Sequence, residues 1–174
     1  VPASRIQKVN IKNDKYYSGV MTKQKRVALT FDDGPNIIYT PKVLNILKKY
    51  NVKATFFVTG TNVKRSPQIA KQIVTAGHEI GNHSNSHPKL TKLSATRVSQ
   101  ELTAANNAIQ QATGTMPTVF RPPYGAYNST IIKLAKMPTI MWSIDTLDWK
   151  HKNPKKVLQS VKNNVKNGSI ILMH

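Results

Sequence analysis

Short apolar runs alternate with helical patterns along most of the chain, and this alternation is the feature that most restricts its fold. From Arg26 onward, six runs have the composition of strands, at 26–31, 53–59, 78–81, 117–120, 139–143 and 169–173. Helical patterns lie between them, at 41–50, 66–76, 93–113, 127–136 and 154–166. Repeated strand–helix units predict a parallel sheet with helices outside it, because parallel strands need long crossover connections.

Two of the predicted strands indicate how deeply this sheet is buried. Phe56-Phe57-Val58 and Ile170-Ile171-Leu172-Met173 are apolar throughout, as strands covered on both faces are. An open doubly wound sheet and a barrel both fit this pattern. The 174 residues suffice for one core, and no repeat or linker is present. We therefore expect one domain over residues 25–174 and an N-terminal arm or short hairpin, over residues 1–24, packed on it.

The charge balance bears on the partners of the chain. Twenty-six Lys and Arg residues face seven Asp and Glu residues, giving a formal net charge of +19. Such a surface attracts nucleic acid, anionic lipid headgroups or an anionic cell wall, although a merely solubilising surface also fits. No dense basic run or nucleic-acid motif occurs, so no nucleic-acid partner is expected. No apolar run is long enough for a transmembrane segment, and the lack of cysteine excludes disulfides and thiolate sites.

Four of the seven acidic residues lie in two tight pairs, and Asp32 and Asp33 form the first pair. The run Val27–Phe31 delivers this pair to the carboxyl end of a predicted strand, directly before Gly34-Pro35. Neighbouring residues on a strand point to opposite sides, but at a turn both carboxylates can enter one pocket. The alternative is a solvated turn, since Asp, Gly and Pro are common turn residues.

Histidine residues follow the third predicted strand. His83 and His87 have three residues between them and can face one ligand from a helix or a tight loop. Imidazole suits zinc and related divalent metals, and two His with one carboxylate form a known catalytic zinc set. Surface or core histidines are the alternative for such a pair. We expect a structural role for His78 and a solvent-facing position for His151.

Three further polar segments follow the later strands. In Arg121-Pro122-Pro123-Tyr124-Gly125 the prolines stiffen a loop whose Arg could hold a carboxylate, although an ordinary Pro-rich loop is the alternative. The segment 142–149 brings Asp145, Asp148 and two Trp residues, which stack on sugars or belong to the core. His174 closes the last strand, and we favour a built-in role over a frayed end. Five polar sets thus follow five parallel strands, where α/β proteins build their sites.

These segments resemble the five motifs of the polysaccharide deacetylases, carbohydrate esterase family 4, which contain the NodB-homology domain. The matching segments, in order, are Thr30–Pro35, His83–His87, Arg121–Gly125, Asp145–Trp149 and Leu172–His174. Among the members, the chain is most similar to Gram-positive peptidoglycan N-acetylglucosamine deacetylases. The resemblance implies a distorted (β/α) barrel with fewer than eight regular units as the catalytic domain over residues 25–174. Here the chain ends early in this fold, at the last motif strand.

The resemblance also implies the metal site and the base. One divalent metal ion, most commonly zinc with cobalt, manganese or nickel as alternatives, would be held by Asp33, His83 and His87. Asp32 would be the general base for the attacking water, and Arg121 would pair with it and set its basicity.

The other implied roles concern the leaving group and the acetyl group. His174 would be the general acid for the amine and would be oriented by Asp148. The backbone N–H of Tyr124 would bind the oxyanion, and Trp149 and Leu172 would line the pocket for the acetyl methyl group.

The implied activity is removal of N-acetyl groups from N-acetylglucosamine residues of peptidoglycan, with release of acetate. Chitin or muramic acid deacetylation and acetylxylan esterase activity use the same groups and remain alternatives. Two other classes of protein are also considered: a non-catalytic wall-binding module and a nucleic-acid binder. The expected partners are an acetylated amino-sugar polymer and an anionic bacterial cell wall. The expected location is extracellular or at the cell surface. Salt would weaken wall binding through the basic surface.

Overall fold

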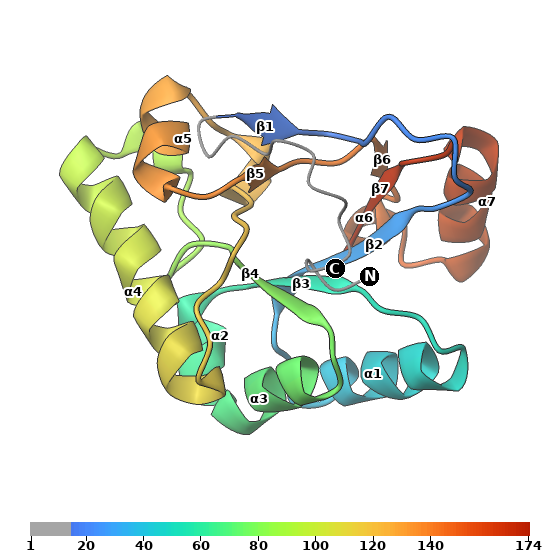
Figure 1. The fold of residues 1–174 in the computed structure, drawn as a ribbon, viewed down its shortest axis with the longest axis horizontal. Coiled ribbons are helices and arrows are strands. Elements are labelled where there is room, and N and C mark those ends of the chain that lie inside the picture. Colours follow the sequence, from blue (N-terminus) through green and yellow to red (C-terminus); the bar gives the residue numbers. More distant parts are fainter. Residues whose placement is uncertain (1–14) are drawn as a thin grey trace.

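The parallel sheet predicted from the sequence is present at the centre of the computed structural model, which describes residues 15–174. Five parallel strands lie in the order β4-β3-β2-β7-β6 (Figure 1). They are β2 (Ala28–Gly34), β3 (Thr55–Val58), β4 (Glu79–Asn82), β6 (Ile144–Asp145) and β7 (Ile170–Met173). Most of the arm predicted for residues 1–24 lies outside the described residues. Its described part contributes β1 (Tyr16–Tyr17), which pairs with β5 (Thr139–Ile140).

Additional bridges continue the sheet into a ring. Asn82 at the end of β4 pairs with Phe120, and Phe120 pairs with Thr139 of β5. Between β5 and β6 the ring is completed by the chain itself and not by strand pairing; β6 then pairs with β7, and β7 pairs with β2. This ring confirms the expected distorted barrel. The strand predicted over 117–120 is reduced to the single bridge at Phe120, because Pro117, Pro122 and Pro123 lack the N–H groups that a longer ladder needs.

Helices pack outside the strands, as the alternation predicts. The predicted helices appear as α1 (Tyr39–Lys49), α3 (Pro67–Thr75), α4 (Ala95–Thr113), α5 (Ser129–Ala135) and α7 (Pro154–Asn164). The sequence did not predict the short helices α2 (Gly60–Arg65) and α6 (Asp148–His151) or the 3-10 turns η2 (Leu90–Lys92) and η3 (Pro123–Gly125). Ser94 caps α4 by accepting a hydrogen bond from Arg97 N. No helix within residues 15–174 is both long and apolar enough to cross a membrane.

Two apolar clusters hold the barrel and its helices together. The first lies between the sheet and helices α1 and α3 and contains Phe56 and Ile73, both at most 3% exposed. The second lies under α4 and α5 and contains Phe120 and Ile131. Burial of each such side chain contributes roughly 1.5–3 kcal/mol. These clusters fix the strands, and therefore the segments that follow their carboxyl ends.

Candidate active site

A β-bulge at the end of β2 places two neighbouring carboxylates in one pocket. The register of β2 against β3 shifts between Phe31 and Gly34, and Asp33 adopts a positive φ of 68°. Asp tolerates this left-handed conformation better than most residues. The bulge interrupts the alternation of side chains, so that Asp32 Oδ2 and Asp33 Oδ1 lie 3.7 and 3.4 Å from His83 Nε2. The sequence predicted a turn here, whereas the strand continues through Gly34.

The Asp33, His83 and His87 side chains form a compact group of ligand atoms. Asp33 Oδ1 lies 3.2 Å from His87 Nε2, and one ligand atom from each residue falls within 4.8 Å of the other two. His83 Nδ1 lies 2.7 Å from Arg121 O, so it carries the proton and leaves the Nε2 lone pair facing Asp33. This donor set of one carboxylate and two imidazoles is one that suits a divalent metal ion such as zinc.

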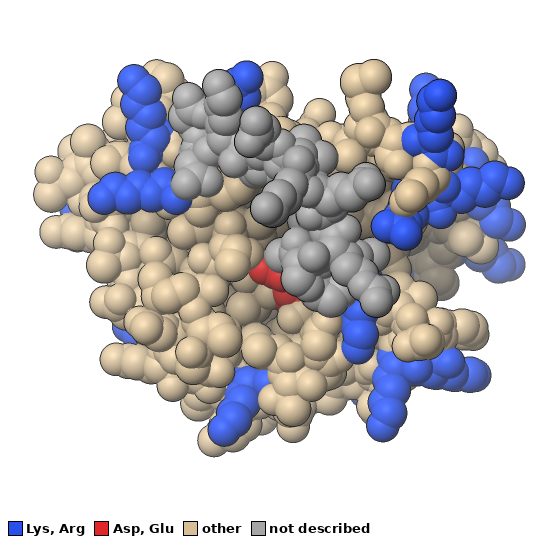
Figure 2. Space-filling model, viewed as in Figure 1, with Lys and Arg blue, Asp and Glu red and all other residues tan. Residues whose placement is uncertain are grey.

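The ionisation of this group also suits a cation. Burial raises the pKa of Asp33, but His83 and His87 in their protonated forms, the first through a hydrogen bond and its charge and the second through its charge, outweigh burial and lower the pKa overall. Burial and the charge of His83 lower the pKa of His87. Carboxylate and neutral imidazole are the protonation states that metal binding requires. Figure 2 shows the acidic atoms of this face in one small area near its centre, whereas Lys and Arg lie around the periphery.

Arg121 fixes the position of Asp32. The Arg121 side chain is fully buried and its Nη1 donates to Asp32 Oδ1 at 2.7 Å and to Thr30 Oγ1 at 2.8 Å. Its Nε and Nη2 donate to the carbonyl oxygens of Ile140 and Met141, both at 2.9 Å. The guanidinium carbon lies 4.1 Å from the centre of the Phe57 ring. Asp32, only 7% exposed, is therefore held by an immobile cation.

A second carboxylate–histidine pair follows β6 and β7. Asp148 Oδ2 accepts the backbone N–H of His174 at 2.6 Å, and Asp148 Oδ1 lies 2.8 Å from His174 Nδ1. Burial lowers the pKa of His174, but the hydrogen bond and charge of Asp148, with smaller contributions from Asp32 and Asp33, raise it overall. Since Asp148 occupies Nδ1, the Nε2 nitrogen of His174 is the one available to another molecule.

The three remaining predicted residues lie in different surroundings. Tyr124, in η3, has a positive φ of 60°, and its ring packs against that of His87 with centroids 4.7 Å apart. Leu172 is buried and pairs in register with Thr30 of β2, so both face the same side of the sheet as the Asp32–Arg121 pair. Trp149 is 57% exposed at the start of α6.

The comparisons with known proteins agree with this geometry. Residues 19–140 match the model of the polysaccharide deacetylase family. The chain belongs to this family. The strand ends of this fold bring Asp32, Asp33, His83, His87 and Arg121 together, whereas Trp149 is exposed in α6 and Leu172 is buried within β7.

Similar deacetylases come from Gram-positive bacteria. The peptidoglycan N-acetylglucosamine deacetylase PgdA of Listeria monocytogenes is 46% identical over 150 residues, which are 86% of this chain and 32% of that protein. The peptidoglycan N-acetylmuramic acid deacetylase PdaC of Bacillus subtilis is 42% identical over 151 residues, 87% of this chain and 32% of that protein. The chain therefore spans about a third of the length of these two relatives.

A solved structure of this family shows the same fold in a protein without the activity. A carbohydrate esterase family 4 pseudoenzyme from Bacillus anthracis superposes with a TM-score of 0.88 at 39% identity, covering 92% of this chain and 60% of that one. The fold alone therefore does not establish catalysis, and the side chains of the site must decide it.

Sequence reasoning missed the residue that holds the histidine loop. Glu101 of α4 accepts hydrogen bonds from Asn85 N at 2.9 Å and from Ser86 N and Ser86 Oγ, both at 2.8 Å. Asn82 Oδ1 adds a bond from Ser84 N at 2.7 Å. These bonds fix the loop between the two histidines, which is not helical. The sequence signal that could have pointed to Glu101 is the scarcity of acidic residues, because the chain has only seven Asp and Glu.

Proposed function

We propose that the chain is a metal-dependent hydrolase that removes N-acetyl groups from N-acetylglucosamine residues of peptidoglycan and releases acetate. The observation that carries this proposal is the group Asp33, His83 and His87 directly beside the buried Asp32–Arg121 pair. The name and 46% identity of the Listeria relative support the sugar. Amide hydrolysis needs a nucleophile, a base, an oxyanion site and an acid: water would be the nucleophile, and Asp32, the Tyr124 N–H and His174 would serve the other three roles.

Asp33, His83 and His87 would hold the metal ion, for which we propose zinc. Cobalt, manganese and nickel accept the same donors. A bound ion supplies Lewis acidity, which polarises the acetyl carbonyl and lowers the pKa of water. The hydrogen bond from His83 Nδ1 to Arg121 O keeps one ligand aligned, and the bonds of Glu101 keep the loop between the histidines in place.

Asp32 would act as the general base. Its Oδ1 is occupied by Arg121, whereas its Oδ2 faces His83 Nε2 and is available to accept a proton from the attacking water. Arg121 cannot move without breaking bonds to several partners, so the carboxylate needs no reorganisation during the reaction. A positioned base of this kind contributes roughly 10²–10⁴-fold to the rate.

His174 would protonate the leaving amine through Nε2. The charge and hydrogen bond of Asp148 raise the pKa of His174 against the effect of burial, so the imidazole keeps its proton to higher pH. The backbone N–H of Tyr124 would donate to the developing oxyanion. Leu172 and Trp149 would line the pocket for the acetyl methyl group.

N-acetylmuramic acid is a second candidate substrate, because the Bacillus subtilis relative, 42% identical, is named for it. With either sugar as its substrate, the protein would act at the bacterial cell wall, outside the membrane. The net charge of +19 would then hold it on anionic wall polymers.

Two variants and a control test the assignment. Zinc content and acetate release from N-acetylglucosamine oligomers are measured for Asp32→Asn, His83→Ala and the control Asp145→Asn. We expect Asp32→Asn to keep its zinc and lose at least ~100-fold in rate, His83→Ala to lose zinc, and Asp145→Asn to resemble the parent. Full activity of Asp32→Asn would remove this residue from the base role. Unchanged zinc content in His83→Ala would contradict the ligand set.

A further inference from the structure

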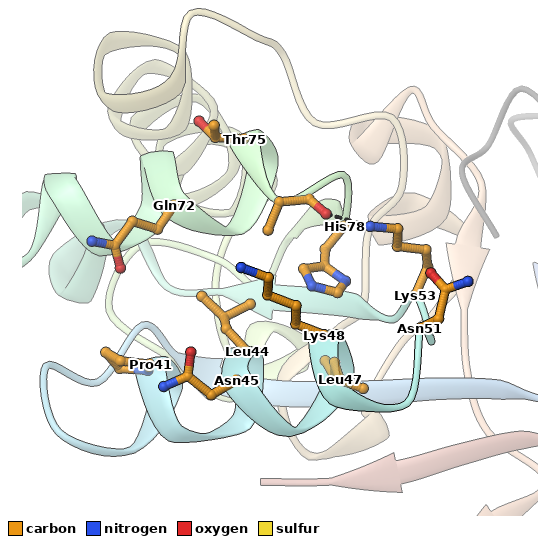
Figure 3. Close-up of a pocket in the computed structure, with 11 residues that line it drawn as sticks. Pro41, Leu44, Asn45, Leu47, Lys48, Asn51, Lys53, Gln72, Thr75 and His78 are labelled. Atoms are coloured by element: carbon orange, nitrogen blue, oxygen red, sulfur yellow. Dashed lines mark hydrogen bonds between the residues drawn. The ribbon is translucent and has the colours of Figure 1, made fainter.

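A cavity lies between α1 and α3, far from the candidate active site. Its volume is about 440 Å³, and Leu44 and Leu47 of α1 form part of its lining together with Lys48, Lys53 and His78 (Figure 3). His78 precedes β4 and His83 follows it, so the two lie about 16 Å apart along the strand at ~3.3 Å per residue. The cavity is therefore at the opposite end of the sheet from the proposed catalytic residues.

The polar side chains of this cavity favour an anion. Besides the two lysines, the lining contains Asn45, Asn51, Gln72 and Thr75, all of which can donate hydrogen bonds. No Asp or Glu is among the lining residues described. In Figure 3 the His78 ring lies between the side chains of Lys48 and Lys53. The charged groups facing the cavity are therefore cations.

His78 contributes an accessible N–H donor whose direction is fixed, on a ring that is largely buried. The side chain is 7% exposed, and its Nδ1 accepts a hydrogen bond from Ala54 N at 3.2 Å. The ring proton is therefore on Nε2, which has no hydrogen-bond acceptor among the described residues. Burial and the charge of Lys53 lower the pKa of His78 to about 4, so at neutral pH the ring is a neutral N–H donor. An oxygen acceptor from outside the protein would satisfy this donor.

We propose that this cavity binds a phosphate group of an anionic phosphodiester polymer, through Lys48 Nζ and His78 Nε2–H, with Leu44 and Leu47 against the carbon atoms of the polyol. Its volume lies within the range of roughly 300–1,000 Å³ that is typical of ligand sites and exceeds what phosphate alone would fill. Lys53 already donates to Ala76 O and adds charge. The site would retain the protein on its polymer independently of the proposed hydrolysis.

The test measures binding by calorimetry at low salt with three probes: inorganic phosphate, glycerol 3-phosphate and poly(glycerol phosphate). The variant is Lys48→Gln, and its matched control is Lys49→Gln, which removes the same charge from the neighbouring residue. Lys49 is not part of the cavity lining, and its Nζ lies 5.6 Å from the centre of the Tyr50 ring. We expect the polymer to bind most tightly and Lys48→Gln to weaken it about threefold to tenfold more than Lys49→Gln does. Acetate release from short oligomers should be the same in both variants.

Nuclear magnetic resonance of His78 gives a second readout. A bound phosphate should raise the pKa of His78 above its value of about 4, because the anion stabilises the imidazolium. Equal polymer binding by Lys48→Gln and Lys49→Gln, or an unmoved His78 signal at saturating polymer, would overturn the site. If inorganic phosphate binds as tightly as the polymer, the cavity is a site for free phosphate. That result would overturn the polymer as the ligand.

Discussion

Replacement of Arg121 by Met should destabilise the protein strongly, because it leaves a buried carboxylate without its cation. Arg121 makes four hydrogen bonds, to Asp32 Oδ1, Thr30 Oγ1, Ile140 O and Met141 O. At a net ~1 kcal/mol each, these bonds sum to about 4 kcal/mol, and breaking a buried ion pair from one side costs a similar ~3–5 kcal/mol. The double variant Arg121→Met, Asp32→Asn should recover part of this loss, since it removes the uncompensated charge of Asp32.

Urea denaturation at neutral pH measures the loss of stability of the single variant and of the double variant, each as a difference in the free energy of unfolding from the parent. We expect a loss of about 3–5 kcal/mol for Arg121→Met and a smaller loss for the double variant. A loss below ~1 kcal/mol for the single variant, in the range of an exposed pair, would refute the view that Arg121 anchors Asp32. So would a double variant that is less stable than Arg121→Met alone.

Three further changes test other parts of the site. Glu101→Ala should weaken zinc binding by about tenfold, measured by competition with a chelator, because the loop that carries His87 loses its support; an unchanged affinity would contradict that role. Asp148→Asn should move the alkaline limb of the pH–rate profile to lower pH, because loss of the Asp148 charge lowers the pKa of the protonated acid His174. An alkaline limb that stays in place would exclude His174 as its source. Gly60→Ala should cost roughly 1–3 kcal/mol in urea denaturation through overpacking, since its Cβ would lie 2.6 Å from Asn85 Oδ1; wild-type stability would show that the loop can move aside.

The sequence predicted the strand ends of the site because apolar runs followed by polar residues have a direct structural meaning. Asp32, His83, Arg121 and His174 each follow an apolar run, and parallel strands bring their carboxyl ends to one edge. The same reasoning could not orient Asp33. Alternation along a regular strand would point it away from Asp32, and only the bulge with its positive φ brings both to His83.

The features that the sequence missed depend on contacts between distant segments or on weak local patterns. Glu101 lies in the middle of a predicted helix, and nothing in its neighbours indicates that it bonds the loop of Ser86. Helix α2 is short, and only Gly60 and Val63 of it are buried, so it has no apolar period to detect. The expected strand at 117–120 was wrong in length because the prolines around Phe120 allow only one bridge.

The most direct test of the proposed function is acetate release from N-acetylglucosamine oligomers and purified peptidoglycan before chelation, after chelation and after return of zinc. We predict release that is lost with the chelator and restored by zinc, because Asp33, His83 and His87 provide the ligand set. Release that persists in full after complete metal removal would contradict the metal-dependent mechanism. No release from either substrate with zinc present would contradict N-deacetylation and place this chain with the inactive members of the fold.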